Sequence, residues 1–313
     1  MTSAVESTDL GPAGMAIGVV GLGAMGLRLA TGLVDAGAQV TAVDPSPEAA
    51  TRAGEAGVTV VPAAADLAGC EVVVLSLPTP RLVLDVVTQL ADAAAAAGAH
   101  LTVLDTSTVG PADARAAAEV AAARGQVYAD TPILGRPESV GRWTFPVGGS
   151  AETVALAQRV LAPVAGLVEG VGDVGAASAT KVLNNLMLGT INAVTAELLV
   201  LADAAGLDPG RWVDLVVGSG AASVSPLFRD VAARAVDGDF EPTFTVQLMH
   251  KDNSLALDLA DQLRVPMITG TAAQHLNTMA LSAGHGAEDS IAVVKVLQTI
   301  TGRDVRRHAH RTT

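Results

Sequence analysis

Aromatic side chains, cysteine and positive charge are all scarce in this chain of 313 residues. Aromatics make up 2% of it, and alanine runs such as Ala93–Ala97 favour close-packed helices over an aromatic-rich core. The single cysteine, Cys70, excludes a disulfide within the chain, which fits a reducing compartment. Lys and Arg number 19 against 32 Asp and Glu, and the resulting net charge of −13 repels a phosphate backbone, so we predict no nucleic-acid partner.

Long apolar runs and a targeting segment are lacking as well. No run of 18 or more apolar residues occurs, because the stretch 183–201 is interrupted by three asparagines and Glu197. The first fourteen residues are small and polar and include Glu6 and Asp9, which is unlike a secretory signal. We therefore interpret residues 1–14 as a flexible leader and expect a cytoplasmic protein with no membrane partner.

The first half of the chain alternates short apolar runs with helical patterns, which is typical of a doubly wound parallel sheet. The predicted strands cover residues 16–20, 39–43, 71–76 and 101–104, followed by weaker candidates at 127–129 and 145–147. The predicted helices cover residues 26–36, 81–97 and 111–124.

The second half is predicted to be all-helical and to be entered through a long interdomain helix over residues 176–205, of about eight turns. Further helices are expected over residues 208–217, 223–236, 245–262, 266–283 and 290–299. The expected organisation is therefore an α/β domain over 15–173, a helical substrate and oligomerisation domain over 174–300, and a basic, solvated tail over 301–313.

A glycine-rich segment follows the first strand and opens the first helix. It has the G-x-G-x-x-G pattern, in the order Gly21, Leu22, Gly23, Ala24, Met25, Gly26. Gly21 permits a tight turn, Gly23 lets the backbone approach a pyrophosphate, and Gly26 lets helix and strand pack closely. The helix N-terminus then offers amide groups and partial positive charge to phosphates. The pattern predicts a Rossmann-type dinucleotide-binding domain, although the glycines could serve a tight turn alone.

Asp44 ends the second strand, 18 residues beyond Gly26. A carboxylate there can bind both adenosine ribose hydroxyls and would repel a 2′-phosphate, which favours NAD over NADP as the cofactor. Two alternatives stay open: Asp44 could cap a helix that starts near Pro47, and the nucleotide could be FAD.

Five further motifs follow the glycine-rich segment Gly21–Gly26, which we call the cradle. They occur in the order found in the β-hydroxyacid dehydrogenase family, which this chain resembles from Met15 to about Gly286. That family includes 3-hydroxyisobutyrate dehydrogenase, tartronate semialdehyde reductase and, more distantly, 6-phosphogluconate dehydrogenase. The motifs are Ser76-Leu77-Pro78, Asp105-Thr106-Ser107-Thr108, Asp130-Thr131-Pro132-Ile133-Leu134-Gly135, the run Gly175 to Asn185, and Lys251-Asp252-Asn253-Ser254-Leu255-Ala256.

The resemblance implies that Leu77, Pro78, Thr108 and Lys251 bind the cofactor. Thr108 could also cap a helix that begins at Pro111. Lys251 could instead be an exposed helix charge that pairs with Asp252 or Asp258.

The substrate loop departs from the family pattern. Leu134 stands where the family has a serine that binds the substrate carboxylate, and Arg136 follows Gly135 where a second glycine is usual. The segment from Pro132 to Gly141 is also two residues shorter than the common family pattern. We take Leu134, Gly135 and Arg136 as candidate substrate-binding residues; Arg136 is either a carboxylate or phosphate clamp or a solvated loop cation.

Lys181 and Asn185 lie four residues apart on the predicted long helix and therefore share a face. An ammonium group can protonate a carbonyl oxygen during reduction and take the proton back in the reverse direction. Asn185 can bind the substrate oxygen or orient the lysine, whereas Asn184 faces about 100° away. The resemblance assigns Lys181 as general acid/base; the alternative is a surface lysine.

The sequence thus predicts an NAD-dependent dehydrogenase or reductase that interconverts a small β-hydroxy acid and its semialdehyde. An imine or non-acid carbonyl reductase on the same scaffold, and an NAD(H)-binding protein without catalysis, are the alternatives. The histidines lack metal-ligand spacing, so no metal is expected. Apolar faces in the helical half predict a homodimer or tetramer, and Trp143, Phe145, Trp212 and Phe228 are expected to pack in the core or an interface, although one of them could line the substrate pocket.

Overall fold

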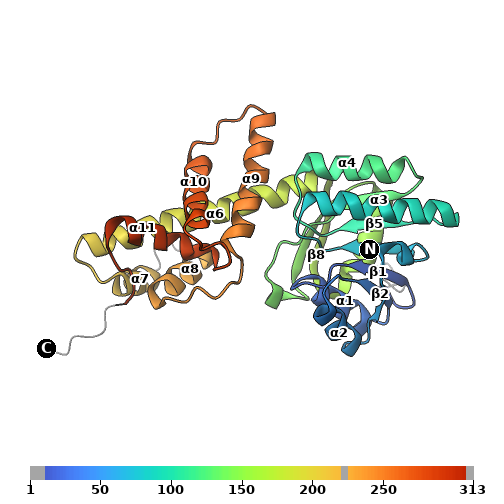
Figure 1. The fold of residues 1–313 in the computed structure, drawn as a ribbon, viewed down its shortest axis with the longest axis horizontal. Helices are drawn as coiled ribbons and strands as arrows, with labels where there is room; N and C mark the ends of the chain where they lie inside the picture. The colour runs from blue at the N-terminus through green and yellow to red at the C-terminus, as the bar shows by residue number, and fades with distance from the viewer. Residues whose placement is uncertain (1–10, 220–224, 308–313) are drawn as a thin grey trace, which may run out of the picture. The chain divides into compact units, whose positions relative to one another are not determined.

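The computed structural model describes residues 11–219 and 225–307 (Figure 1). The chain divides into two compact units, Met1–Lys181 and Val182–Thr313, and each is described by itself. The division falls inside one continuous helix, α6 (Ala176–Ala204), so it lies eight residues beyond the predicted domain boundary at 173/174.

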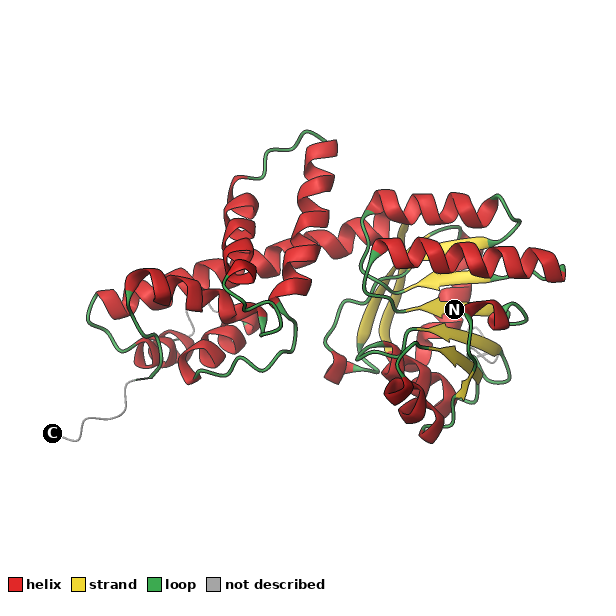
Figure 2. Cartoon of the chain, viewed as in Figure 1, coloured by secondary structure: helices red, strands yellow, loops and turns green. Residues whose placement is uncertain are grey.

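The first unit is built on one sheet, whose strands are drawn in yellow in Figure 2. The sheet has eight strands in the order β3-β2-β1-β4-β5-β6-β7-β8. Neighbouring strands are parallel except for the antiparallel pair β6 and β7, so the sheet is mostly parallel. The strands are β1 (Ala16–Val20), β2 (Gln39–Val43), β3 (Thr59–Val60), β4 (Val72–Leu75), β5 (Thr102–Asp105), β6 (Val127–Asp130), β7 (Trp143–Gly148) and β8 (Ala165–Gly172).

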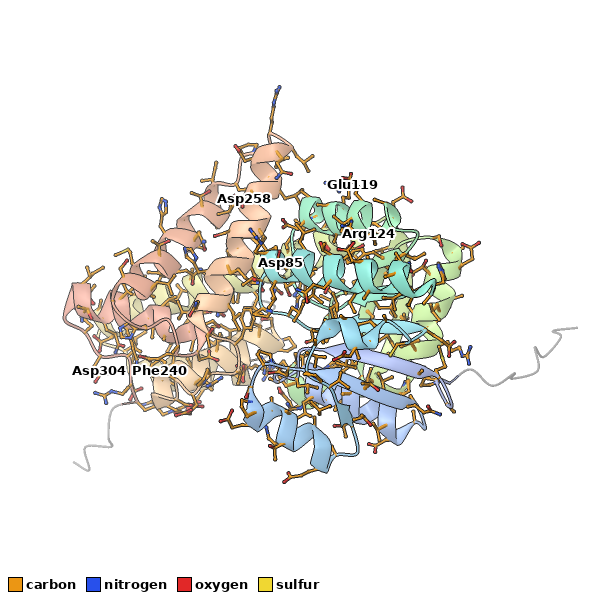
Figure 3. All side chains as sticks on the ribbon, turned by 45° about the vertical axis from the view of Figure 1, so that its right-hand side comes forward. Asp85, Glu119, Arg124, Phe240, Asp258 and Asp304 are labelled. Atoms are coloured by element: carbon orange, nitrogen blue, oxygen red, sulfur yellow. The ribbon has the colours of Figure 1, made fainter. Side chains whose placement is uncertain are left out.

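Helices cover both faces of this sheet, which confirms the doubly wound architecture. Alternate strand side chains supply the two cores: Val72 and Val74 of β4 face α1, α2 and α5, whereas Val73 and Leu75 face α3 and α4. The helices are α1 (Gly26–Asp35), α2 (Pro47–Glu55), α3 (Pro80–Ala97), α4 (Pro111–Ala122) and α5 (Ala151–Leu161). Figure 3 labels Arg124, just after α4, which forms an ion pair with Asp92 of α3.

The second unit is helical, as predicted. Among its described residues the backbone forms no strand, only an isolated bridge between Thr245 and Asp289. Its core gathers side chains of α6, α8 and α11, including Leu199, Val231 and Val294. Beside α6, the helices are α7 (Pro209–Gly218), α8 (Pro226–Asp237), α9 (Val246–Gln262), α10 (Ile268–Ser282) and α11 (Val293–Thr301).

The structure describes parts of the predicted leader, residues 1–14, and of the predicted tail, residues 301–313. Gly14, in the predicted leader, donates its backbone N–H to the Gly37 carbonyl at 2.9 Å. In the predicted basic tail, Val305 is fully buried, and Arg307 pairs with Asp214 and Asp237. Val305 therefore anchors the described part of the tail, whose other residues are exposed, while residues 1–10 and 308–313 lie outside the described residues.

Helix α6 is long and apolar enough, by length and composition, to cross a membrane, with a mean hydropathy of 1.5. However, 56% of that window is buried inside the protein, and its buried positions include Asn185, Asn192 and Thr195. The Asn192 amide donates to the Ser290 hydroxyl at 2.7 Å. Buried amides bonded to neighbouring helices are typical of a core helix.

Candidate functional site

The glycine-rich turn after β1 needs glycine at two positions for steric reasons. Gly21 has φ +95°, and a Cβ on it would lie 2.3 Å from the Ser76 carbonyl oxygen. A Cβ on Gly26 would lie 1.9 Å from the Gly21 carbonyl oxygen. The turn and the close helix-to-strand packing predicted for these residues are therefore both present.

Gly23 is different, because a Cβ on it would meet no atom within 4 Å. No contact inside the protein therefore requires glycine at this position, and the missing side chain leaves open space beside the backbone. Helix α1 begins three residues later, and its N-cap residue, Met25, makes no side-chain capping bond. An open backbone at an uncapped helix N-terminus fits a pyrophosphate group.

The Asp44 carboxylate sits beside this turn. Its Oδ2 accepts the Leu22 N–H at 2.6 Å, and its Oδ1 accepts the Ser46 N–H at 2.8 Å. Ser46, not Asp44, is the N-cap of α2, because its hydroxyl accepts the Ala49 N–H. The alternative capping role of Asp44 is therefore wrong. Each carboxylate oxygen keeps acceptor capacity for a ribose hydroxyl.

A second network lies at the carboxyl ends of β4 and β5. The Asp105 carboxylate accepts the Ser107 N–H at 2.9 Å and the Tyr128 hydroxyl at 2.8 Å. The Ser107 hydroxyl in turn accepts the Leu77 N–H at 2.9 Å. These bonds hold the Leu77-Pro78 turn against the residues that precede Thr108. Gly110 is the N-cap of α4, so Thr108 does not have the alternative capping role.

Burial dominates the electrostatics of Asp105, which is 1% exposed, and raises its pKa above the usual range despite these hydrogen bonds. A carboxyl whose pKa is higher in the folded state contributes stability below its unfolded pKa, and that contribution is lost as pH rises through the folded pKa. We expect Asp105→Asn to lack this loss. The melting temperature of Asp105→Asn, relative to that of wild type, should therefore increase as pH rises from about 4 to 7. Thermal unfolding at constant ionic strength measures this difference.

Glu48→Gln is the matched control, since a hydrogen bond from Ser46 lowers the pKa of the exposed Glu48 carboxyl. A carboxyl with a lowered pKa stabilises the wild-type protein increasingly as pH rises, and Glu48→Gln lacks this contribution. The melting temperature of Glu48→Gln, relative to that of wild type, should therefore decrease as pH rises. A pH-independent difference between Asp105→Asn and wild type would contradict the assignment.

Asp130, the first residue of the substrate-loop motif, anchors the start of α6. Its Oδ1 accepts the Gly175 N–H at 2.9 Å and its Oδ2 accepts the Ser178 N–H at 2.7 Å. The carboxylate is 1% exposed and satisfies amides of the first helical turn. Lys181, one turn further along α6, is half-buried. The loop that leaves β6 and the helix that carries Lys181 thus start from one buried carboxylate.

The loop after Asp130 holds the three candidate substrate-binding residues. Leu134 is half-buried and pairs with Thr144, whereas Gly135 and Arg136 are exposed. The side chains of Trp143 and Phe145 are fully buried below it, in edge-to-face contact at 6.2 Å between ring centroids. Their predicted packing role is confirmed, as is that of Trp212 and Phe228 at 6.1 Å.

In the second unit, α9 and α6 are joined by polar side chains, of which Asn185 and Asp252 are buried. The Asn185 amide donates to Asp252, and its oxygen accepts the Asn184 amide at 3.0 Å. The other Asp252 oxygen pairs with the Lys251 ammonium at 2.9 Å. Of the two alternatives for Lys251, pairing with Asp252 is therefore observed, while Asp258 is exposed on the same helix (Figure 3).

Close packing supports this junction of α6 and α9. Gly189, one turn beyond Asn185, lies against the fully buried Asn253, and a Cβ there would be 2.5 Å from the Asn253 amide nitrogen. The sequence did not predict the roles of Asp252 and Asp130. Each lay inside a quoted motif, but neither motif showed that the carboxylate would bind a distant helix.

The predicted cofactor residues of the first unit all follow the carboxyl ends of parallel strands: the cradle follows β1, Asp44 follows β2, Leu77 follows β4, and Thr108 follows β5. Dinucleotides bind at this edge in open α/β sheets. Lys251 and Asn185 belong to the second unit. Within residues 11–219 and 225–307, no group of three or more His, Cys, Asp or Glu side chains could hold a metal ion.

Comparison with known proteins covers both units. Residues 16–173 match the family model of the NAD binding domain of 6-phosphogluconate dehydrogenase. Residues 175–297 match the family model described as NAD-binding of NADP-dependent 3-hydroxyisobutyrate dehydrogenase.

Whole-chain relatives agree with these matches. L-threonate dehydrogenase of Cupriavidus necator is 34% identical over 91% of this chain and 96% of the relative. 3-sulfolactaldehyde reductase of Escherichia coli is 30% identical over 92% of this chain and 97% of the relative. The structure of Mycobacterium tuberculosis 3-hydroxyisobutyrate dehydrogenase with L-serine superimposes with a TM-score of 0.81 at 31% identity, over 91% of this chain and 99% of the other. The chain therefore belongs to the β-hydroxyacid dehydrogenase family and is an NAD(P)-dependent oxidoreductase that acts on CH–OH groups.

Proposed function

We propose that this enzyme interconverts a small β-hydroxy acid and its semialdehyde, with Lys181 as the general acid/base. One observation carries the assignment. The Asp130 carboxylate holds the first turn of α6 and begins the substrate loop, so the lysine and the loop leave the same point at the carboxyl edge of the sheet. A proton donor and an acid-binding loop are the two protein groups that reduction of an acid-bearing aldehyde requires.

When bound, the nicotinamide donates or accepts the hydride at the substrate carbon. The Lys181 ammonium donates its proton to the carbonyl oxygen during reduction and, as the free amine, takes the hydroxyl proton during oxidation. The Asn185 amide is bonded to Asp252 and Asn184, and we assign its second N–H to the substrate oxygen. Lys251, held by Asp252, is assigned to the cofactor together with Leu77, Pro78 and Thr108.

We assign Arg136 to bind the substrate's acid group. In the family this role belongs to a serine, and Leu134 stands at the position of that serine. A guanidinium can form paired hydrogen bonds to a carboxylate or a sulfonate. The names of two relatives, L-threonate dehydrogenase and 3-sulfolactaldehyde reductase, include one substrate of each kind. We expect this enzyme to require such a group on its substrate.

The experiment that tests this function follows NADH absorbance with a panel of carboxylate-bearing semialdehydes, uncharged aldehydes and cyclic imines. Turnover confined to the acid-bearing aldehydes supports the proposal. Turnover of uncharged aldehydes or cyclic imines would favour a non-acid carbonyl or imine reductase. NADH binding without any turnover would indicate a protein that only binds the cofactor.

NAD is the proposed cofactor, because a carboxylate at the end of the second strand, here Asp44, favours ribose hydroxyls and would repel a 2′-phosphate. We expect Asp44→Ser to weaken NADH binding about tenfold and to narrow the preference for NADH over NADPH, as charge-assisted hydrogen bonds and a repulsion are both lost. Fluorescence titration of both cofactors measures this. Asp35→Ser on α1 is a control distant from the β2 carboxyl end, and tighter NADPH than NADH binding by wild type would contradict the assignment.

The second unit exposes an apolar stripe on α6, which is the surface that we assign to a homodimer or tetramer. Its members are spaced along one side of the helix and are 40–62% exposed: Leu183, Met187, Val194, Leu198 and Leu201. Contiguous exposed apolar surface of this kind marks association sites. Light scattering should give an even oligomer, and Met187→Glu with Leu201→Glu should yield monomers.

We place the enzyme in the cytoplasm.

A further inference from the structure

The substrate loop is closed at its neck by backbone pairing. Leu134 and Thr144 exchange two backbone hydrogen bonds, at 2.8 and 3.1 Å. The Gly141 N–H donates to the Val164 carbonyl at 3.0 Å, which ties the far side of the loop to the short 3-10 helix Ala162–Val164 that follows α5. Such a loop has few ways to move as a whole, so the direction of each side chain depends on bonds inside it.

Inside the loop, one carbonyl oxygen accepts three hydrogen bonds. The Arg136 carbonyl receives the Ser139 N–H at 3.0 Å, the Ser139 hydroxyl at 2.8 Å and the Trp143 indole N–H at 2.7 Å. The Arg136 N–H donates to the same Ser139 hydroxyl at 3.1 Å. Both peptide groups that flank the Arg136 α-carbon are therefore fixed, and with them the direction in which its side chain leaves the backbone.

Trp143 makes this arrangement durable. Its side chain is fully buried, and a buried indole N–H without an acceptor would be unfavourable, so the bond to Arg136 has to persist. The ring also lies against Gly135, where a Cβ would be 2.5 Å from the Trp143 Cδ1 atom. The glycine beside Arg136 is therefore required by the indole, and the loop cannot rotate this segment without displacing the tryptophan.

We infer that Trp143 is a positioning residue for the substrate's acid group: its indole N–H holds the Arg136 backbone so that the guanidinium is presented from a rigid loop. This inference rests on the proposed function, because it assigns Arg136 to the acid. It goes further in making acid-group affinity depend on a buried tryptophan that touches neither substrate nor cofactor. Trp143 acts on KM through Arg136 and leaves the hydride and proton steps unchanged.

The test replaces Trp143 by phenylalanine, which keeps an aromatic ring and removes the N–H. KM for a carboxylate-bearing semialdehyde should rise about tenfold, while kcat and NADH affinity stay within about twofold, because one buried hydrogen bond acts on binding alone. Ser139→Ala, which removes a second donor to the same carbonyl, should act in the same direction. Trp212→Phe, in the second unit, is the matched control and should leave KM unchanged.

A coupling measurement separates positioning from general weakening of the fold. In an Arg136→Met background, Trp143→Phe should cause no further rise in KM, since the guanidinium that it positions is gone. An equal penalty in both backgrounds would overturn the inference, and so would a fall in kcat with unchanged KM.

Amide hydrogen exchange gives a readout that does not depend on turnover. Trp143→Phe should speed exchange at the Ser139 amide, which donates to the Arg136 carbonyl, and leave exchange in β1 and β4 unchanged. Unchanged exchange in the loop would refute the positioning role even in an active enzyme. If Trp143→Phe speeds exchange in the loop but the wild-type protein turns over no acid-bearing aldehyde, the proposed function is wrong, while the role of Trp143 in holding the Arg136 backbone stands.

Discussion

Replacing Lys181 by methionine should lower kcat by about two to four orders of magnitude while NADH affinity changes little, because the side chain supplies a proton and not a cofactor contact. Methionine retains most of the apolar length of lysine, so the half-buried position stays filled. Steady-state kinetics on an acid-bearing semialdehyde, together with NADH fluorescence titration, measure the two effects separately.

Two variants sharpen this result. Lys295→Met removes a lysine on α11 that pairs with Glu288, and its turnover should match wild type. Lys251→Met should weaken cofactor binding with a smaller effect on kcat under saturating cofactor. Turnover that survives in Lys181→Met would remove the lysine from the proton step and leave the dinucleotide domain as assigned.

Replacing Gly23 by alanine should abolish detectable NADH binding in the micromolar range without lowering the thermal stability of the cofactor-free protein. The added methyl group would meet no protein atom within 4 Å, so folding has no reason to suffer. The same methyl would occupy the space where the backbone approaches the pyrophosphate. Thermal unfolding without cofactor and an NADH titration on the same sample test both halves.

Gly26→Ala and Gly54→Ala are the two comparison variants for Gly23→Ala. A Cβ at Gly26 would overlap the Gly21 carbonyl, so Gly26→Ala should lose stability as well as binding. A Cβ at Gly54, inside α2, meets nothing within 4 Å, and Gly54→Ala should be as stable as wild type or more so, with normal binding. Wild-type NADH affinity in Gly23→Ala would place the pyrophosphate elsewhere.

Local pattern was enough to predict most of the fold. Continuous apolar runs such as 72–75 are buried on both faces of a parallel sheet, and these produced the correct strands. The strands β3 and β8 were missed, because β3 has two residues and six of the eight residues of β8 are exposed, so neither shows an apolar run or alternation. Helix α5 was overlooked after the last strand candidate, at 145–147, although Ser150 caps it as a serine commonly does.

The site divides in the same way. Glycine at 26 is required by the Gly21 carbonyl, five residues away, and Asp44 bonds Leu22 within one strand–helix–strand unit, so a sequence pattern records these contacts directly. The bonds that hold the site in place are long-range. Tyr128 reaches Asp105 across 23 positions, Asp130 reaches Ser178 across 48, and Asn185 reaches Asp252 across 67.

The sequence by itself determined the dinucleotide domain, the helical second half and the family, because glycine geometry, apolar periodicity and motif order are local properties of the chain. Only the tertiary structure decided that Asp130 anchors the helix of Lys181, that Asp252 holds Asn185 and Lys251, and that Trp143 holds the Arg136 carbonyl. The physical reason is that a buried carboxylate or indole takes whichever partner the packing of the sheet and helices brings within hydrogen-bonding distance, and that partner is not recorded in the residues beside it.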